Sequence, residues 1–174
     1  MTAYVSEVLG THDRLAFASG NERVDAYFHR TVTQDVKRRY AACYVLVDKA
    51  SGSLAGFYTL SSYSIPIDEI ADDMARKLPR YPSVPAVLLG WMGRASEFRG
   101  RQIGALLLAD AIHRVVHSPV GAHALCADAI DEAAAAFYKA HQFLPLISRP
   151  SSLFLPMKTA LALFPPAALA RPAG

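Results

Sequence analysis

The order of apolar and polar positions divides the first part of the chain into a strand, a helical segment and a hairpin. Residues 3–9 (AYVSEVL) alternate weakly, which predicts a strand. In residues 21–39 apolar side chains recur every three or four positions, which predicts one helix or two consecutive ones, with Asn21 as the N-cap. Two β-rich runs joined by Lys-Ala-Ser-Gly-Ser follow, so residues 41–65 should form an antiparallel hairpin.

The second part of the chain continues with alternating helices and strands. Residues 67–78 show apolar positions at helical spacing between Pro66 and Pro79, which predicts a short amphipathic helix. The remaining pattern predicts a strand at 86–95, a helix at 103–117, a strand at 121–130, a helix at 131–143 and a final strand over 153–164. Elements in this order are typical of a layered α/β or α+β domain with a mixed sheet.

The composition supports one independently folding domain. The 174 residues are 52% hydrophobic and 19% charged, which provides enough apolar surface to offset the entropy of ordering the chain. We expect a single domain over 1–164 and a flexible tail over 165–174, where prolines and small residues dominate. Because no apolar run approaches a membrane span and the first residues do not resemble a secretory signal, we expect a cytoplasmic protein.

The cysteines and histidines do not form a pattern of metal ligands. Cys43 and Cys126 lie far apart in apolar stretches, which favours burial as small hydrophobic side chains over a disulfide or a metal site. His113 and His117 have the spacing that puts two ligands on one helix face, but no third ligand accompanies them. We therefore expect no metal.

Residues 99–105 (RGRQIGA) stand between a predicted strand and a predicted helix. At such a place main-chain N–H groups and the helix dipole would face an anion, and glycines would let the anion approach the backbone. The segment is neither a dinucleotide-binding G-x-G-x-x-G motif nor a P-loop. It predicts either a pyrophosphate cradle or a plain strand-to-helix turn.

Tyr138 is the second candidate for chemistry. It falls on the helix predicted after the next strand, in a run that begins with Asp131 and Glu132. A phenol can act as a general acid toward a strongly basic leaving group such as a thiolate. The alternative is a structural tyrosine whose ring packs beside Phe137 and Phe143.

Together these segments resemble the GCN5-related N-acetyltransferase (GNAT) family. Its [Q/R]-x-x-G-x-[G/A] motif is matched at all but its fourth position by residues 99–104. These residues are preceded by the strand sequence VLLGWMG and followed by a strand, a helix with Phe137-Tyr138, and His141-Gln142-Phe143. The resemblance covers most of the chain. It implies the GNAT fold, a mixed and mostly antiparallel six- to seven-stranded sheet flanked by helices, and an acetyl-CoA-dependent N-acetyltransferase that forms homodimers.

The resemblance also implies roles for individual residues. In the family, loop amides bind the pyrophosphate of acetyl-CoA, the preceding strand pairs with the pantetheine arm, and a helical tyrosine protonates the departing thiolate. These roles fall on Tyr138 as the general acid and on the main chain of Met92 and Arg94 for pantetheine, with the Met92 N–H as the candidate oxyanion donor. The residues expected to bind pyrophosphate are Arg99, Gly100, Arg101, Ile103, Gly104 and Ala105.

Two positions depart from the family pattern. Gln102 stands where the family usually has a glycine; a glutamine with negative φ could donate the same N–H, so we expect an altered loop shape without loss of binding. Asp131, the candidate for a side-chain contact to the cofactor, stands where many relatives have Asn. Cys126 has no adjacent histidine, so transfer should be direct, and water or Glu97 could accept the proton of the amine.

Residues 12–47, 56–65 and 78–95 look like one branch of the family, which contains toxins of type II toxin–antitoxin modules. Those toxins acetylate the α-amino group of aminoacyl-tRNA and pair with ribbon-helix-helix antitoxins. The resemblance therefore implies tRNA and an antitoxin as partners.

The formal net charge of +3 is small, so the placement of the basic residues matters more than their number. Arg76, Lys77 and Arg80 form a cluster that would suit the tRNA backbone, although a solvated face is the commoner reading of such a cluster. Two alternatives stay open. The acceptor could be a small-molecule or protein amine, or the chain could be a non-catalytic acyl-CoA- or antitoxin-binding module.

Overall fold

A computed structural model of the protein describes residues 3–164, so the tail predicted at 165–174 lies outside the described residues. The strands are β1 (Tyr4–Val8), β2 (Ala42–Asp48), β3 (Leu54–Pro66), β4 (Ser83–Arg94), β5 (Ala124–Asp128), β6 (Leu144–Pro145) and β7 (Ser152–Pro156). The α-helices are α1 (Glu22–Ala26), α2 (Val32–Lys37), α3 (Asp72–Ala75), α4 (Ile103–Val116), α5 (Glu132–Ala140) and α6 (Met157–Leu163). Shorter turns are the π-helical η1 (Tyr27–Thr31) and the 3₁₀-helical η2 (Ile67–Glu69) and η3 (Ser96–Phe98).

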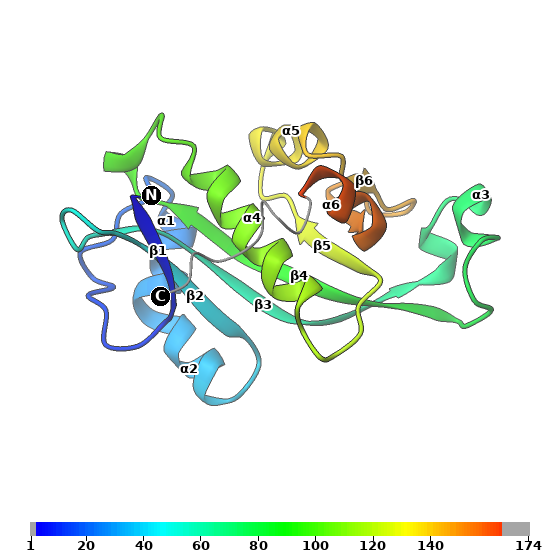
Figure 1. The fold of residues 1–174 in the computed structure, drawn as a ribbon, viewed down its shortest axis with the longest axis horizontal. Coiled ribbons are helices and arrows are strands. Elements are labelled where there is room, and N and C mark those ends of the chain that lie inside the picture. Colours follow the sequence, from blue (N-terminus) through cyan, green and yellow to red (C-terminus); the bar gives the residue numbers. More distant parts are fainter. Residues whose placement is uncertain (1–2, 165–174) are drawn as a thin grey trace. The chain divides into compact units, whose positions relative to one another are not determined.

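The described strands form one seven-stranded sheet in the order β1-β2-β3-β4-β5-β7-β6 (Figure 1). The pairs β1–β2, β2–β3, β5–β7 and β6–β7 are antiparallel, and β4–β5 is parallel. A mixed, mostly antiparallel sheet with helices confirms the predicted fold class. The chain separates into two compact units: the first runs to Ser61 and includes Gly90–Ala111, and the second holds Ser62–Leu89 and continues from Ile112.

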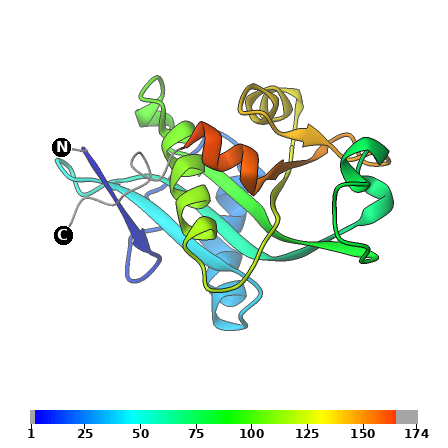
Figure 2. The same ribbon diagram turned by 45° about the vertical axis from the view of Figure 1, so that its right-hand side comes forward.

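In the first unit, β3 separates two layers of side chains because successive residues of a strand point to opposite faces. On one face, a Cβ at Gly56 would lie 2.8 Å from the side chain of Leu107 in α4, so only glycine allows this close packing. On the other face, the Phe57 ring stacks on Phe28 of η1 at 4.0 Å between centroids. Figures 1 and 2 show the first half of α4 and the α1–α2 segment on opposite faces of β2 and β3.

A half-buried carboxylate joins three elements of the first unit. Ser6 of β1 and Tyr58 of β3 each donate a hydrogen bond of 2.5 Å to Oδ2 of Asp110 in α4. Because a carboxylate that is partly removed from water needs hydrogen-bond donors, this pair of donors helps to hold α4 against the strands.

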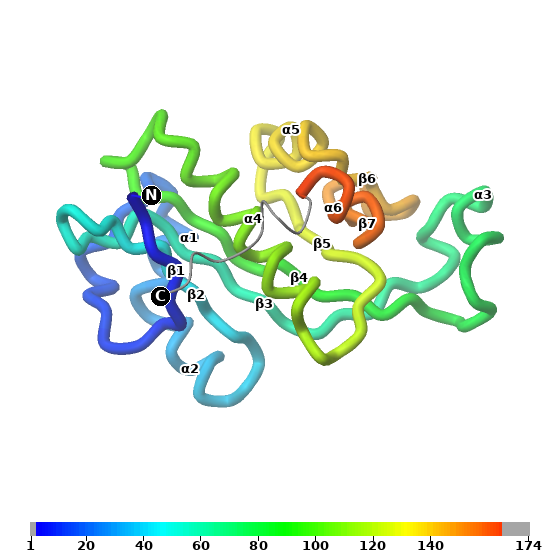
Figure 3. The backbone as a smooth tube through the Cα atoms, viewed as in Figure 1, coloured from blue at the N-terminus to red at the C-terminus, as the bar shows by residue number. Residues whose placement is uncertain are grey.

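In the second unit, a core forms where β4, β5 and β7 meet the segment between β3 and β4. Figure 3 traces the chain from β5 through α5 to β7 and α6. The buried residues of this core are Ile65, Ile70, Val84, Ala86, Ala124, Cys126, Leu146 and Phe154. Two polar contacts reinforce this region. Ser148 hydrogen-bonds to Glu69 in the segment between β3 and β4, and Arg149 donates to the hydroxyl of Tyr63 in β3 at 2.9 Å.

Several elements confirm the sequence predictions. The hairpin pairs β2 with β3, and α4 stops at Val116, before the predicted limit of residue 117. The helical segment at 21–39 is divided into α1, η1 and α2, and the Asn21 side chain accepts hydrogen bonds from the N–H groups of Arg23 and Val24 as the predicted N-cap.

Two predictions about secondary structure are wrong. The helix expected at 67–78 is only η2 and the four-residue α3, because Ile70 adopts an extended conformation and its side chain, 2% exposed, enters the core. The final strand expected over 153–164 ends at Pro156 and continues as α6, which buries Ala160 and exposes Leu161 and Leu163. The short strand β6 lies at residues to which the sequence pattern assigned no element.

No helix in the described part of the chain is both long enough and apolar enough to cross a membrane.

Candidate active site

The loop between η3 and α4 turns sharply at two residues with positive φ. Gly100 has φ 81°, which glycine adopts at little cost, whereas Gln102 has φ 57° in the left-handed region that other residues avoid. The expectation of a negative φ at Gln102 is therefore wrong. The loop keeps a glycine-like conformation at this position despite the larger side chain.

This turn leaves a row of main-chain donors at the start of α4. Within the described residues, the N–H groups of Gln102, Ile103, Gly104 and Ala105 donate to no carbonyl or side chain, and Leu106 is the first to bond back, to the carbonyl of Gln102. Helix N-termini with open N–H groups bind anions, because the donors and the helix dipole act in the same direction. The residues predicted to bind pyrophosphate therefore include main-chain N–H groups that are open to an anion.

Two arginines flank these donors. Arg99 and Arg101 are exposed, and the Arg101 guanidinium lies 5.2 Å from the centre of the Phe98 ring. Because Phe98 is buried, its ring can hold the Arg101 guanidinium beside the loop by a cation–π contact. The local charge therefore adds to the attraction that the helix start has for an anion.

The end of β4 lies just before this loop. The parallel ladder between β4 and β5 runs from Ala86 to Leu89, so residues 90–94 lie beyond it. Met92 and Arg94, the residues predicted to pair with pantetheine, are half-buried there. Gly93 is packed tightly, since a Cβ would lie 2.7 Å from Val24.

The sequence analysis missed a cluster around Trp91. The Trp91 ring stacks on Tyr27, with 4.3 Å between centroids and an interplanar angle of 8°. The Tyr27 hydroxyl donates to Oδ2 of Asp35 at 3.0 Å, and the Trp91 N–H donates to Oγ1 of Thr59 at 2.9 Å. Burial, with Asp35 as a further cause, raises the pKa of Tyr27 above its ordinary range. The signal in the sequence was the single tryptophan of the chain, within Gly90-Trp91-Met92-Gly93.

Tyr138 lies in the second unit, on α5. The Asp131 side chain caps this helix by accepting the N–H of Ala134 at 2.7 Å. Tyr138 is 5% exposed, and its ring contacts Phe137 and Phe143 with centroids 5.4 and 5.1 Å away, so the packing expected of a structural tyrosine is present.

The Tyr138 hydroxyl is nevertheless not used by the fold. Among the described residues it makes no hydrogen bond, and burial, together with the charge of Asp128, raises its pKa. A phenol that stays protonated and has no partner in its own chain can give its proton to a bound ligand.

The predicted site residues divide between the two units. The loop residues, Met92, Arg94 and the candidate base Glu97 belong to the first, and Asp131 and Tyr138 belong to the second. The second unit also holds the predicted tRNA residues Arg76, Lys77 and Arg80, all exposed after α3.

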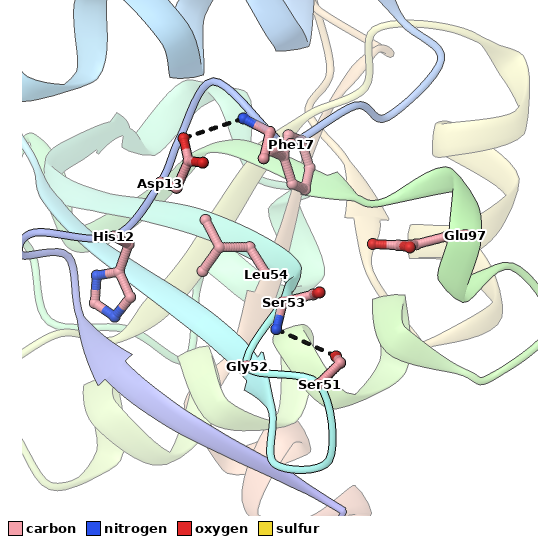
Figure 4. A pocket seen from close by; sticks show the side chains of 9 residues that line it. His12, Asp13, Phe17, Ser51, Gly52, Ser53, Leu54 and Glu97 are labelled. Carbon is pink, nitrogen blue, oxygen red and sulfur yellow. Dashed lines mark hydrogen bonds between the residues drawn. The ribbon is translucent and has the colours of Figure 1, made fainter.

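A cavity of about 250 Å³ opens in the first unit between residues 12–17, the β2–β3 turn and Glu97 (Figure 4). The Glu97 side chain points toward Ser53 and Leu54 across this cavity. Asp13 accepts the N–H of Ala16, so its carboxylate is partly occupied. The residues predicted to bind the cofactor do not line this cavity.

Both cysteines are buried and free, at 1% and 3% exposure for Cys43 and Cys126, which confirms their prediction as small hydrophobic side chains. Burial raises the pKa of each thiol to about 12. A thiol that stays protonated is a poor nucleophile, which supports direct transfer over a covalent enzyme intermediate.

The chain is similar to two curated bacterial toxins, whereas no family model matches it. It is 31% identical over 157 residues to the "Probable toxin TacT" of Sinorhizobium fredii (strain NBRC 101917 / NGR234), covering 85% of this chain and 87% of the relative. It is also 31% identical over 153 residues to the "tRNA-acetylating toxin" of Mycobacterium tuberculosis (strain ATCC 25618 / H37Rv), covering 87% and 90%.

Solved structures of similar proteins share the fold. AtaT complexed with acetyl-methionyl-tRNAfMet superposes with a TM-score of 0.84 at 26% identity, over 92% of this chain and 99% of that chain. The crystal structure of AtaTR bound with AcCoA gives a TM-score of 0.80 at 26% identity, over 94% and 99%.

Proposed function

Because the chain belongs to the GNAT family, in its branch of tRNA-acetylating toxins, we propose that it transfers the acetyl group of acetyl-CoA to the α-amino group of aminoacyl-tRNA. The observation that carries this proposal is the row of open N–H groups at residues 102–105, in a chain that matches such toxins over most of its length.

Acetyl-CoA is the donor, and its pyrophosphate fits the start of α4. The N–H groups of Ile103, Gly104 and Ala105 would bind the phosphate oxygens, assisted by the dipole of a 14-residue helix. Arg99 and Arg101 would offset the remaining charge. The pantetheine arm would follow the main chain of Met92 and Arg94, where β4 has passed the end of its ladder with β5.

The chemistry is a direct nucleophilic substitution at the thioester. The neutral α-amino nitrogen forms a bond to the carbonyl carbon, and the carbonyl electron pair moves to oxygen, where the Met92 N–H stabilises the charge. Collapse of this intermediate breaks the carbon–sulfur bond. Tyr138 donates its proton to the departing CoA thiolate, and the ammonium proton leaves to water or to Glu97.

The acceptor is recognised in part through its phosphates. Arg76, Lys77 and Arg80 are exposed and close together in the sequence, which suits contact with the tRNA backbone. Such contacts release counterions, so the KM for aminoacyl-tRNA should rise steeply with added salt. Binding of this kind selects tRNA without reading its sequence.

The assembly in the cell follows from the toxin branch. The protein would act as a cytoplasmic homodimer and would be neutralised by a ribbon-helix-helix antitoxin. Support comes from the toxin names of both relatives and from the resemblance of residues 12–47 to that branch. Light scattering would measure the oligomeric state.

The decisive experiment offers labelled acetyl-CoA with charged tRNAs, uncharged tRNAs and small amines, using the wild-type protein and Tyr138→Phe. Label that enters only charged tRNA and is lost in Tyr138→Phe supports the proposal. Label in small amines would instead make the protein a metabolic acetyltransferase, and binding of acetyl-CoA without transfer would make it a binding module.

A further inference from the structure

The peptide between Trp91 and Met92 is flanked by two glycines, in the sequence Gly90-Trp91-Met92-Gly93. Glycine gives the backbone more conformational freedom than any other residue. This peptide carries the N–H that stabilises the oxyanion in the proposed reaction. An oxyanion donor acts only when it is held in place before the charge develops, so its orientation requires an anchor.

The first anchor holds the backbone of Trp91. Its N–H donates to Oγ1 of Thr59 in β3 at 2.9 Å, and Thr59 is only 2% exposed. The two strands approach closely at this point, because a Cβ at Gly90 would lie 3.0 Å from the same Oγ1 atom. Thr59 thus fixes the peptide directly before the one that carries the Met92 N–H.

The second anchor holds the side chain of Trp91. Its ring lies flat on Tyr27, and the Tyr27 hydroxyl is in turn held by Asp35 at 3.0 Å. The two anchors meet at Trp91, since Thr59 binds its N–H group and Tyr27 stacks on its ring.

We propose that Tyr27, Thr59 and Trp91 form a clamp that orients the Met92 N–H toward the thioester carbonyl of acetyl-CoA. Tyr27 and Thr59 are then positioning residues, which act on the reaction through Met92. This inference rests on the proposed function, since it takes Met92 as the oxyanion donor. The clamp gives a functional role to the stacked Tyr27 and Trp91 rings and to the buried Thr59.

The test variant is Thr59→Val, which keeps the shape of the side chain and removes the acceptor. We expect kcat for transfer to aminoacyl-tRNA to fall at least about tenfold, because small displacements of a catalytic group are costly. The KM for aminoacyl-tRNA and the Kd for acetyl-CoA should change by less than about twofold. Thr59→Ser should restore kcat. The matched control is Thr33→Val, at an exposed position of α2.

A spectroscopic readout tests the orientation without catalysis. The carbonyl of carbon-13-labelled acetyl-CoA is observed by infrared difference spectroscopy in the bound state. A hydrogen bond from Met92 lowers the stretching frequency below that of free acetyl-CoA. We expect this lowering in the wild-type protein and in Thr33→Val, and a frequency closer to the free value in Thr59→Val.

Unchanged kcat and unchanged frequency in folded Thr59→Val would overturn the clamp, as would a higher KM with unchanged kcat or no lowering in the wild type. If Thr59→Val does not fold, Tyr27→Phe decides by the same measurements, because it keeps the stack and loses the bond to Asp35. Failure of the wild type to acetylate tRNA would contradict the proposed function instead, while the frequency of bound acetyl-CoA still tests the clamp.

Discussion

Tyr27 in the first unit and Tyr138 in the second are both buried, but their hydroxyl groups differ in hydrogen bonding. Tyr27 in the first unit donates to Asp35 and stacks on Trp91. Tyr138 in the second unit packs between Phe137 and Phe143, and its hydroxyl makes no hydrogen bond within the described residues. Burial raises the pKa of both, so the contrast lies in their partners and not in their acidity.

The N-termini of the two longest helices show the same contrast between satisfied and open polar groups, but here the open groups lie in the first unit. Helix α5 in the second unit begins with a cap from Asp131, whereas the start of α4 in the first unit leaves the N–H groups of residues 102–105 open. Folded chains satisfy nearly all of their polar groups. Among the described residues, the Tyr138 hydroxyl and the N–H groups of residues 102–105 have no partner, and the proposed reaction uses both.

The largest effect should come from Tyr138→Phe. If its hydroxyl is the general acid, kcat should fall by about 10²-fold or more, with the Kd for acetyl-CoA unchanged. Tyr27→Phe should lower kcat by about tenfold, because it acts only through the clamp. Steady-state kinetics with aminoacyl-tRNA measures both. An equal fall in the two variants would remove the distinction between acid and positioning residue.

Stability should show the reverse order. Tyr27→Phe removes a hydrogen bond to a carboxylate and should lower the free energy of unfolding by about 2 kcal/mol. Tyr138→Phe removes a hydroxyl without a partner among residues 3–164 and should change the free energy of unfolding by less than about 0.5 kcal/mol. Urea unfolding followed by circular dichroism measures the difference. A larger loss for Tyr138→Phe would show that its hydroxyl has a structural role.

The residues of these two sites differ in how well the sequence reveals them. Tyr138 and the loop at 99–105 stand in local motifs, and the alternating pattern around them was enough to place β4, α4, β5 and α5. Tyr27, Thr59 and Trp91 come from three separate segments, and no local pattern links them. Their contact depends on the pairing of β3 with β4 and on the packing of η1, which are properties of the folded chain.

At the helix starts, Asp131→Ala should lower the free energy of unfolding by about 1 kcal/mol, because it removes the cap of α5. Asp131→Asn should be nearly neutral, since asparagine caps as well as aspartate. Thermal unfolding compares the two variants. The Kd for acetyl-CoA, measured in parallel, tests the cofactor contact: a change in Asp131→Asn would show that the carboxylate does more than cap the helix.

The smallest effect is expected for Gln102→Gly. A residue other than glycine in the left-handed region costs about 1 kcal/mol, and the gain on removing it is partly offset by the greater entropy of glycine in the unfolded chain. The variant should therefore be more stable by up to about 1 kcal/mol, with an unchanged Kd for acetyl-CoA. Gln102→Ala, which keeps the strain, is the control. A weaker Kd would mean that the glutamine side chain contributes to binding.

The errors in the fold prediction occur where the packing of the folded chain, and not the local sequence pattern, determines the backbone conformation. Residues 67–78 have helical spacing, but Ile70 gains more by entering the core of the second unit than by extending a short helix between prolines. Residues 153–164 contain two short patterns in succession, a fully buried strand and an amphipathic helix, and the boundary at Pro156 is visible only once α6 is seen against β7. The positive φ of Gln102 likewise has no signal in its residue type.

The π-helical turn at Tyr27–Thr31, where the Val32 N–H bonds to the carbonyl of Tyr27, contains one residue more than the α-helical turn it replaces. In evolutionary terms it is equivalent to a single-residue insertion. Deleting one residue there would restore a regular helix and rotate the residues before it by roughly 100° relative to those after it. Tyr27 would then no longer lie over Trp91. The length of this helical segment, and not only its composition, therefore determines whether the stacked pair can form.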